Sequence, residues 1–316
     1  MANPATEAIE RDLGALGVEH GDFLLVMADV RYLRLPKDSL GQRPKDFASE
    51  LLAGLLMTVG KRGTVMSMTF SPVDWFPRRR ANRRRFNRSD RPTTGGLAAA
   101  MVQHPESVRS THPSNSFTAI GPIADEVLRF HTPYSYTQRP VEDLVNRGGK
   151  MLTIGCVDTT PGFSTVHLAQ YHLGLSQRSL VAGLPRSEFI DPSGRPSVFR
   201  KKDIPGCSMG FGKMYPVYRR AGYLRESAVC RARSVLISAP EAYKLDYAVL
   251  AQDPIALNCD SPDCIDCQVL KHYQPGLTLK DALVVAKEGY RRVVPARMWP
   301  SRMVSDDAGR LGGTRR

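Results

Sequence analysis

Three short apolar segments constrain what this chain can fold into. Residues 22–30, 64–70 and 151–156 are almost uninterrupted apolar runs of strand length. Runs of this kind are typical of strands that are buried on both faces. Segments with helical spacing alternate with them, as in residues 44–59, where Gly60 ends the pattern. The sequence therefore predicts an α/β protein whose sheet is covered on both faces.

The remaining elements follow from the same patterns. A strand is expected at 229–238 and a hairpin over 188–202. Helices are expected at 4–16, 95–103, 121–130, 140–147, 163–175, 209–222 and 240–252. The 316 residues are enough to bury a sizeable core. Because no run of about 18 apolar residues occurs, no membrane-spanning helix is predicted. Residues 1–21 lack the pattern of a secretory signal, so we expect a cytoplasmic protein.

The charge is concentrated in one segment. The formal net charge is +13, and eight arginines lie within 14 positions: Arg78, Arg79, Arg80, Arg83, Arg84, Arg85, Arg88 and Arg91. One interpretation is a solvated basic loop. The other is recognition of an anionic ligand, either a phosphorylated or carboxylated amino compound or an acidic acyl carrier protein. Nucleic acid is a weaker candidate, because no recognised nucleic-acid motif accompanies the arginines.

The six cysteines are not expected to form disulfides in a cytoplasmic chain. Cys259, Cys264, Cys267 and His272 have a spacing that could hold a tetrahedral zinc ion, with Cys207 or Cys230 as an alternative fourth ligand. An iron–sulfur cluster and unligated thiols are the alternatives.

A change in composition divides the chain after residue 257. Residues 1–257 are expected to form the main domain. Residues 258–316 form an extension that contains the cysteine cluster and ends in a basic tail, which we expect to be disordered.

Three segments carry a resemblance to a known family. Residues 109–121 read Arg-Ser-Thr-His-Pro-Ser-Asn-Ser-Phe-Thr-Ala-Ile-Gly, residues 149–155 read Gly-Lys-Met-Leu-Thr-Ile-Gly, and residues 164–170 read Ser-Thr-Val-His-Leu-Ala-Gln. In sequence and order they resemble motifs of the aminoglycoside 3-N-acetyltransferases, also called antibiotic N-acetyltransferases. The similarity extends from about residue 7 to residue 257. It implies a three-layer α/β/α sandwich around a mixed central sheet, and transfer of an acetyl group from acetyl-CoA to a primary amine.

The resemblance also implies roles for individual residues. His167 matches the family's catalytic histidine, and histidine is a suitable general base near neutral pH because its pKa lies close to 7. The alternative is a core histidine on an apolar helix face. Four side chains match the family segment that contacts CoA: Arg109, Ser110, His112 and Ser116. Their alternative role is to hold a turn through side-chain hydrogen bonds.

Thr94 and Gly95 precede an expected helix, where backbone N–H groups favour an anionic group. The sequence also departs from the family at two positions. Asp29 lies where the family has a serine-containing loop, and Gln170 replaces a glutamate that follows the histidine. Because an ionised partner stabilises an imidazolium more than an amide does, Asp29 or Asp158 could supply the missing charge. The alternative for Asp29 is a helix or turn cap.

These observations favour an N-acetyltransferase that acts on a small amine-bearing metabolite. Aminoglycosides are polycations whose pocket should be rich in carboxylates, so an acceptor other than a typical aminoglycoside is expected. Two alternatives remain: an acyltransferase that takes its acyl group from an acyl carrier protein, and a non-catalytic scaffold that binds an acidic partner.

Overall fold

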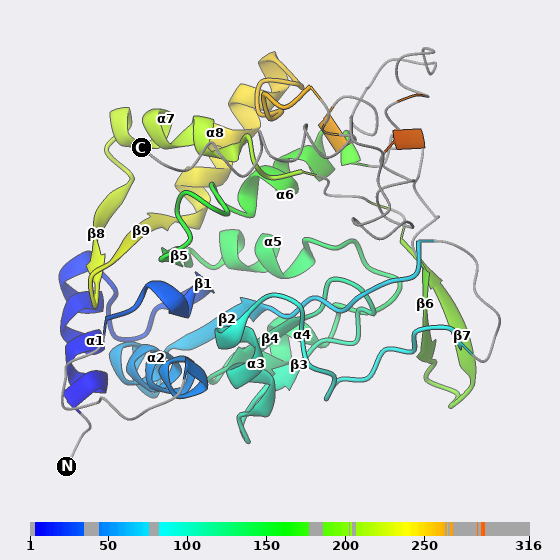
Figure 1. Cartoon of the computed structure of the whole chain (residues 1–316), viewed down its shortest axis with the longest axis horizontal. Coiled ribbons are helices and arrows are strands. Elements are labelled where there is room, and N and C mark those ends of the chain that lie inside the picture. Colours follow the sequence, from blue (N-terminus) through cyan, green and yellow to red (C-terminus); the bar gives the residue numbers. More distant parts are fainter. Residues whose placement is uncertain are drawn as a thin grey trace, which may run out of the picture.

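Seven strands form the central sheet of the computed structural model (Figure 1), which describes residues 4–34, 44–75, 82–176, 186–201, 203, 207–262, 264, 266–267, 283 and 286–287. The strand order is β3-β4-β2-β1-β5-β9-β8. The strands are β1 (Phe23–Ala28), β2 (Thr64–Met68), β3 (Val108–Arg109), β4 (Phe117–Ile120), β5 (Lys150–Ile154), β8 (Arg225–Val229) and β9 (Ala232–Ser238).

The sheet is mixed, and its centre is parallel. Leu25 of β1 pairs in parallel register with Met66 of β2 on one side and with Met151 of β5 on the other. The other pairings, including those of β2 with β4 and of β5 with β9, are antiparallel. The carboxyl ends of β1, β2 and β5 therefore meet at one edge of the sheet.

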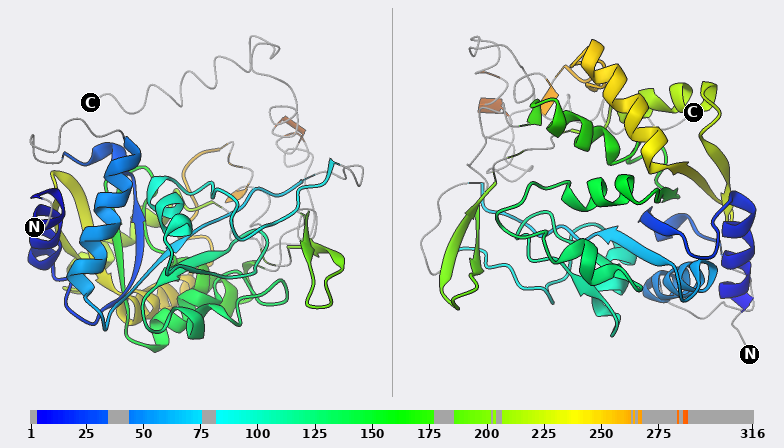
Figure 2. Two further views of the ribbon diagram at one scale, coloured as in Figure 1. Left: turned by 90° about the horizontal axis from the view of Figure 1, so that it is seen from below. Right: turned by 180° about the vertical axis from the view of Figure 1, so that it is seen from behind.

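Alternate side chains of β1 enter two separate cores, and helices cover both faces (Figures 1 and 2). Leu24 and Val26 pack with α1, α2 and α3, whereas Phe23 and Leu25 pack with the helices of the opposite layer. The helices are α1 (Pro4–Leu16), α2 (Pro44–Val59), α3 (Gly96–Gln103), α4 (Ala124–Leu128), α5 (Arg139–Asn146), α6 (Thr165–His172), α7 (Tyr215–Arg220) and α8 (Ala239–Gln252). The expected three-layer α/β/α sandwich is confirmed.

The sequence missed several short elements. The expected strand at 229–238 is the second half of a hairpin, because Cys230 and Arg231 adopt positive φ angles of 45° and 67° and reverse the chain between β8 and β9. β8 is mostly exposed and polar, so it lacks an apolar signal. The helix expected at 209–222 begins instead as a 3-10 helix, η5 (Phe211–Met214), and continues as α7.

The expected hairpin at 188–202 is present as β6 (Arg186–Ile190) and β7 (Pro196–Arg200), outside the central sheet (Figure 1). The described part of the arginine-rich segment contacts the hairpin through Glu188, a buried carboxylate of β6, and also contacts Asp74, a buried carboxylate that precedes the segment. Glu188 accepts from Arg83 and Arg85 at 3.3 and 3.4 Å, and Asp74 pairs with Arg84 at 3.3 Å. These three arginines pair with buried carboxylates, but their side chains are still 40 to 55% exposed, so both interpretations of the basic segment stay predictions.

No helix among the described residues combines the length and the apolar character needed to cross a membrane. The domain boundary expected after residue 257 stays a prediction. Just beyond that boundary, the side-chain amide of Asn258 donates to the carbonyl oxygen of Cys267 at 3.2 Å, so residues 258 and 267 of the expected extension are in contact. The tail at 309–316 lies outside the described residues.

A buried carboxyl group lies between α7 and α8. The Tyr218 hydroxyl donates a hydrogen bond to Asp246, and both side chains are inaccessible to solvent. Burial raises the pKa of Asp246 from 3.8 to about 7, against the opposing effect of the Tyr218 hydrogen bond. A carboxyl group whose pKa is raised by folding binds its proton more tightly in the folded chain than in the unfolded chain.

Asp246 should therefore make the protein less stable as the pH rises. Between pH 4 and pH 7 the unfolded chain releases this proton while the folded chain retains it, so the free energy of unfolding falls through that window. In Asp246→Asn, urea unfolding at pH 5 and pH 8 should show a smaller fall, by about 2 to 3 kcal/mol. Asp125→Asn, on the exposed start of α4, should behave as wild type. An equal fall in Asp246→Asn and wild type would contradict this account.

Candidate active site

A cavity of about 600 Å³ lies where the three parallel strands end. Ligands of α/β proteins commonly bind at the carboxyl ends of parallel strands, because loops and helix N-termini converge there. The cavity is lined by the ends of β1 and β2, by the segment that starts α3, and by residues that follow β5: Met27, Ala28, Asp29, Val30, Arg31, Ser67, Met68, Thr93, Thr94, Gly95, Gly96, Leu97, Ala98, Cys156, Thr159 and Thr160.

The start of α3 is tied to the end of β2. The Thr94 hydroxyl donates to the Met68 carbonyl oxygen at 2.5 Å, and Thr93 donates to the carbonyl oxygen of Phe70 through both its amide and its hydroxyl. Gly95 caps the helix with a φ of 104°, which favours glycine. The first turn of a helix has N–H groups without acceptors inside the helix. Thr94 and Gly95 thus place such donors at the cavity wall, as the sequence predicted.

Asp29 also lines the cavity, just after β1, and acts as a cap. Its carboxylate accepts from the Arg31 amide at 3.1 Å and pairs with the Arg31 guanidinium at 2.6 Å. Hydrogen bonding from the Arg31 side chain lowers the pKa of Asp29. The structure thus gives Asp29 the capping role named as its alternative, and its catalytic role stays a prediction. Asp158, the other candidate charge, is largely exposed and pairs with Arg233 at 2.5 Å.

His167 is half-buried on α6 and lies beside the residue that replaces the family's glutamate. Its Nδ1 lies 3.1 Å from Gln170 Oε1. The ring of Phe211 packs edge-on against the imidazole, with 4.7 Å between centroids. Ser164, one helical turn before His167, donates to the sulfur of Met68 at 3.7 Å, and Met68 lines the cavity. Phe211 could not be predicted from the sequence, because only the tertiary fold brings η5 to α6.

Arg109 is committed to the fold. Its Nε donates to Ser116 Oγ at 3.1 Å, and its two terminal nitrogens donate to the carbonyl oxygens of Arg88, Asp90 and Thr69 and to the hydroxyl of Ser71, at 2.6 to 3.0 Å. These contacts account for all five donors of a guanidinium. Contact between Arg109 and CoA would require some of these donors to be released.

The other three expected CoA ligands are also buried in this segment. The Phe117 amide donates to Ser110 Oγ at 3.0 Å, and the same oxygen lies 3.0 Å from Nδ1 of His131. His112 stacks on His131, with 4.7 Å between ring centroids, and its Nδ1 accepts from the Asn115 amide. Burial lowers the pKa of both histidines, that of His131 to about 3.

Ser116 Oγ donates to the Thr69 carbonyl oxygen at 2.6 Å. The structure therefore places Ser110, His112 and Ser116 in the hydrogen-bonded turn named as their alternative, away from the cavity wall. Their contact with CoA stays a prediction. His131, which sequence reasoning missed, has no motif that would have revealed it.

A second cavity, of about 800 Å³, separates the arginine-rich segment from the β6–β7 hairpin. Arg85 and Arg88 line it on one side, and Asp191 is its only carboxylate among the described residues. The aromatic rings of Phe86, Tyr134 and Phe189 supply apolar surface. The cavity is thus positively charged overall.

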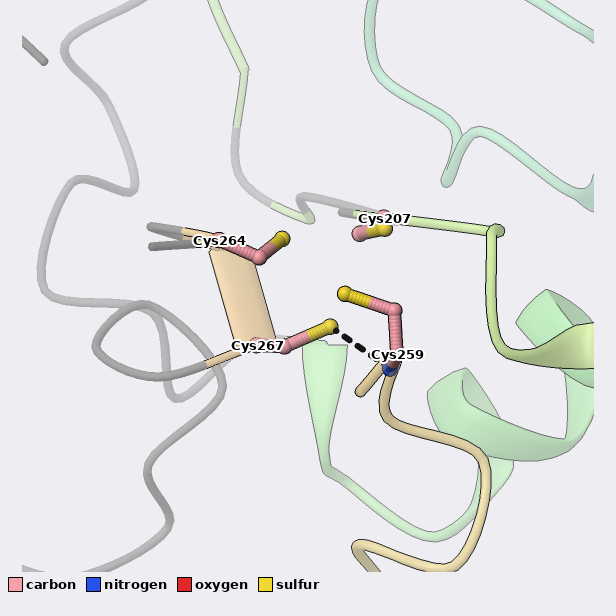
Figure 3. Close-up of side chains that lie close together, drawn as sticks. All are labelled: Cys207, Cys259, Cys264 and Cys267. Carbon is pink, nitrogen blue, oxygen red and sulfur yellow. Dashed lines mark hydrogen bonds between the residues drawn. The ribbon is translucent and has the colours of Figure 1, made fainter. Parts of the chain in front are cut away.

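The structure brings three of the predicted zinc ligands together with one of the two alternative fourth ligands. Cys259, Cys264 and Cys267 lie together, and the fourth member of the group is Cys207, with all four sulfur atoms within 4.8 Å of one another (Figure 3). Cys230 lies elsewhere, in the turn between β8 and β9. His272 is outside the described residues. Cys156 lines the first cavity, and burial raises the pKa of its thiol to about 11, which favours an unreactive thiol.

Comparison with known proteins agrees with this architecture. The computed fold resembles that of the apoenzyme of aminoglycoside acetyltransferase AAC(3)-IVa, with a TM-score of 0.68, 20% identity, and coverage of 85% of this chain and 97% of that one. A structure described as AAC-IIIb binary with CoASH gives a TM-score of 0.66 at 23% identity, over 78% of this chain and 96% of that one. The fold is thus that of the aminoglycoside acetyltransferases.

The sequence comparison assigns the family. The model of the aminoglycoside 3-N-acetyltransferase family matches residues 38–251. Aminoglycoside N(3)-acetyltransferase III of Serratia marcescens is 26% identical over 275 residues, which cover 78% of this chain and 97% of the relative. This chain belongs to the aminoglycoside 3-N-acetyltransferase family, whose members are N-acetyltransferases that act on amino groups.

The contacts of Arg109 predict a large loss of stability on its removal. Arg109→Met should lower the free energy of unfolding by about 3 kcal/mol or more, because it removes five hydrogen bonds of a buried guanidinium, to the carbonyl oxygens of Thr69, Arg88 and Asp90 and to the hydroxyls of Ser71 and Ser116. Urea unfolding measures the loss. Arg91→Met, which changes an exposed arginine of the arginine-rich segment, should change stability by less than about 0.5 kcal/mol. Wild-type stability combined with a raised KM for acetyl-CoA would instead assign Arg109 to the ligand.

Proposed function

We propose that this chain transfers the acetyl group of acetyl-CoA to a primary amine, with His167 as the general base. The observation that carries the proposal is the hydrogen bond of His167 Nδ1 with the Gln170 amide oxygen at 3.1 Å, on a helix whose preceding residue Ser164 contacts Met68 of the cavity wall. A tautomer that has its proton on Nδ1 satisfies that oxygen and leaves Nε2 with a lone pair. Nε2 can then accept the proton of an amine.

The reaction balances without a further group. A protonated amine cannot attack a thioester, so the ammonium first releases one proton to solvent water and reacts as the neutral amine. As its nitrogen bonds to the thioester carbonyl carbon, the excess proton passes to Nε2 of His167. Donors at the start of α3, near Thr94 and Gly95, are suited to stabilise the oxyanion that forms. Collapse of the intermediate breaks the carbon–sulfur bond, and the departing thiolate takes its proton from the imidazolium.

Acetyl-CoA as the donor is supported by the family and by the relative whose title names CoASH. The first cavity is the favoured site for the thioester, because its wall combines the α3 donors with apolar side chains such as Met27, Met68 and Leu97. Arg31 is its only lining guanidinium among the described residues, and it is already paired with Asp29.

The acceptor in this proposal is a small amine other than a typical aminoglycoside, although the relatives are named for aminoglycosides. A polycation requires carboxylates to bind it. Each of the two cavities has one carboxylate among its described lining residues, Asp29 and Asp191, and that of Asp29 is neutralised by Arg31. The second cavity is also lined by Arg88, and by Arg85, which pairs with Glu188; its lining therefore offers a cationic contact for an amine that bears a carboxylate or phosphate.

The direct test is His167→Ala, assayed for acetyl-CoA-dependent thiol release over a panel of amines. Loss of the base should lower kcat by about 10²-fold or more, while calorimetry should give a Kd for acetyl-CoA within a few-fold of wild type. His20→Ala, an exposed histidine outside both cavities, is the matched control and should keep wild-type rates.

Each part of the proposal fails on a different result. Undiminished thiol release by His167→Ala would exclude the histidine as base. No binding of acetyl-CoA to the wild-type chain would point to an acyl carrier protein as donor. A higher kcat/KM for a polycationic aminoglycoside than for anionic or neutral amines would overturn the acceptor assignment.

The amide at position 170 predicts a distinctive pH profile. In Gln170→Glu, a carboxylate beside Nδ1 would stabilise the imidazolium, so the acid limb of the kcat–pH profile should move up by about one to two pH units. Gln170→Met removes the hydrogen bond without adding charge, so it should lower kcat with no shift of this kind. A superimposable profile for Gln170→Glu would show that residue 170 does not act on the base.

A further inference from the structure

Four cysteines from three separate segments converge beside the core. Cys264 and Cys267 share one turn, Cys259 follows α8, and Cys207 precedes η5 (Figure 3). Their sulfur atoms face one another and all lie within 4.8 Å. None of the four forms a disulfide. Such convergence of thiols from separate segments requires a physical reason, because contacts between uncharged thiols contribute little to the free energy of folding.

We propose that these four cysteines bind one structural zinc ion. Zinc–thiolate bonds of about 2.3 Å place the sulfurs of a tetrahedral site about 3.8 Å apart. Sulfur atoms within 4.8 Å of one another need only small movements to reach that arrangement. The site is of the closed four-cysteine type, with no open coordination position, so zinc would have a structural role there rather than a catalytic one.

Backbone donors already point at two of the sulfur atoms. The Met209 amide donates to Cys207 Sγ at 3.4 Å, and the Cys259 amide donates to Cys267 Sγ at 3.3 Å. Hydrogen bonds of this kind offset the negative charge of metal-bound thiolates and orient them. The Cys267 amide also donates to the Cys264 carbonyl oxygen at 3.1 Å, which closes the turn and brings both side chains to one side.

The site joins the segment after α8 to the segment before η5. Lys213 of η5 reinforces this junction by donating to the Asn258 carbonyl oxygen and to Asp260, both at 2.8 Å. Gly210 approaches so closely that an added Cβ would lie 2.2 Å from the Leu257 carbonyl oxygen. The next residue, Phe211, is buried and packs against His167. Zinc would therefore fix the segment that holds the Phe211 ring in place.

The test is the metal content of the full chain, purified from zinc-supplemented cells without chelator. Elemental analysis should give about one zinc per wild-type chain. Cys264→Ser and Cys207→Ser should lose the metal, whereas Cys207→His should retain it, because imidazole is also a zinc ligand. Cys230→Ser, which removes a buried cysteine outside the group, is the matched control and should keep its zinc.

A measurement on the wild-type chain covers the case in which the serine variants fail to fold. A thiol-specific mercurial should release one zinc per chain to a colorimetric indicator, and zinc removal should lower Tm by roughly 5 °C or more. Retention of zinc by the serine variants, wild-type protein without stoichiometric zinc, iron in its place, or disulfides among these cysteines would overturn the proposal. Only the inference that zinc stabilises the surroundings of His167 rests on the proposed function. The zinc stoichiometry is measured independently of any enzymatic activity.

Discussion

The parallel pairing of β1 with both of its neighbours is the constraint on which the rest of this structure depends. Because β1, β2 and β5 run in the same direction, their carboxyl ends share one edge. The turn after β1, the start of α3 and the residues after β5 must then converge on that edge, and the cavity forms among them. The apolar side chains on both faces of the strands fix the register, since a slip of one residue would exchange the two cores.

The polar residues near this edge form two groups: buried residues that stabilise the fold, and residues that line the cavity. Arg109 and the stacked pair His112 and His131 are buried, and their hydrogen bonds hold the segment from Ser110 to Phe117 in place. The donors at the start of α3 remain at the cavity wall. The residues of the 109–121 motif thus stabilise the fold, whereas the cavity wall is formed by Thr94 and Gly95, which belong to a weaker sequence pattern.

The surroundings of His167 depend on contacts between distant segments. Gln170 comes from the same helix, but Phe211 arrives from η5, whose start is held by the close approach of Gly210 to Leu257 and by the cysteine group around Cys207. The extension after residue 257 is therefore coupled to the active site through packing. Under the zinc proposal, the cysteines would stabilise the surroundings of His167 without contacting substrate.

The sequence by itself determined the family, the α/β/α layers and the candidacy of His167, because apolar periodicity and the local motifs are written along the chain. It also placed Thr94 and Gly95 before a helix. Only the tertiary structure decided that Asp29 is paired with Arg31, that Arg109 has all its donors engaged, and that Cys207 completes the cysteine group. The physical reason is that hydrogen-bond partners and convergent thiols are set by distance in space, which spacing in the sequence does not encode across separate elements.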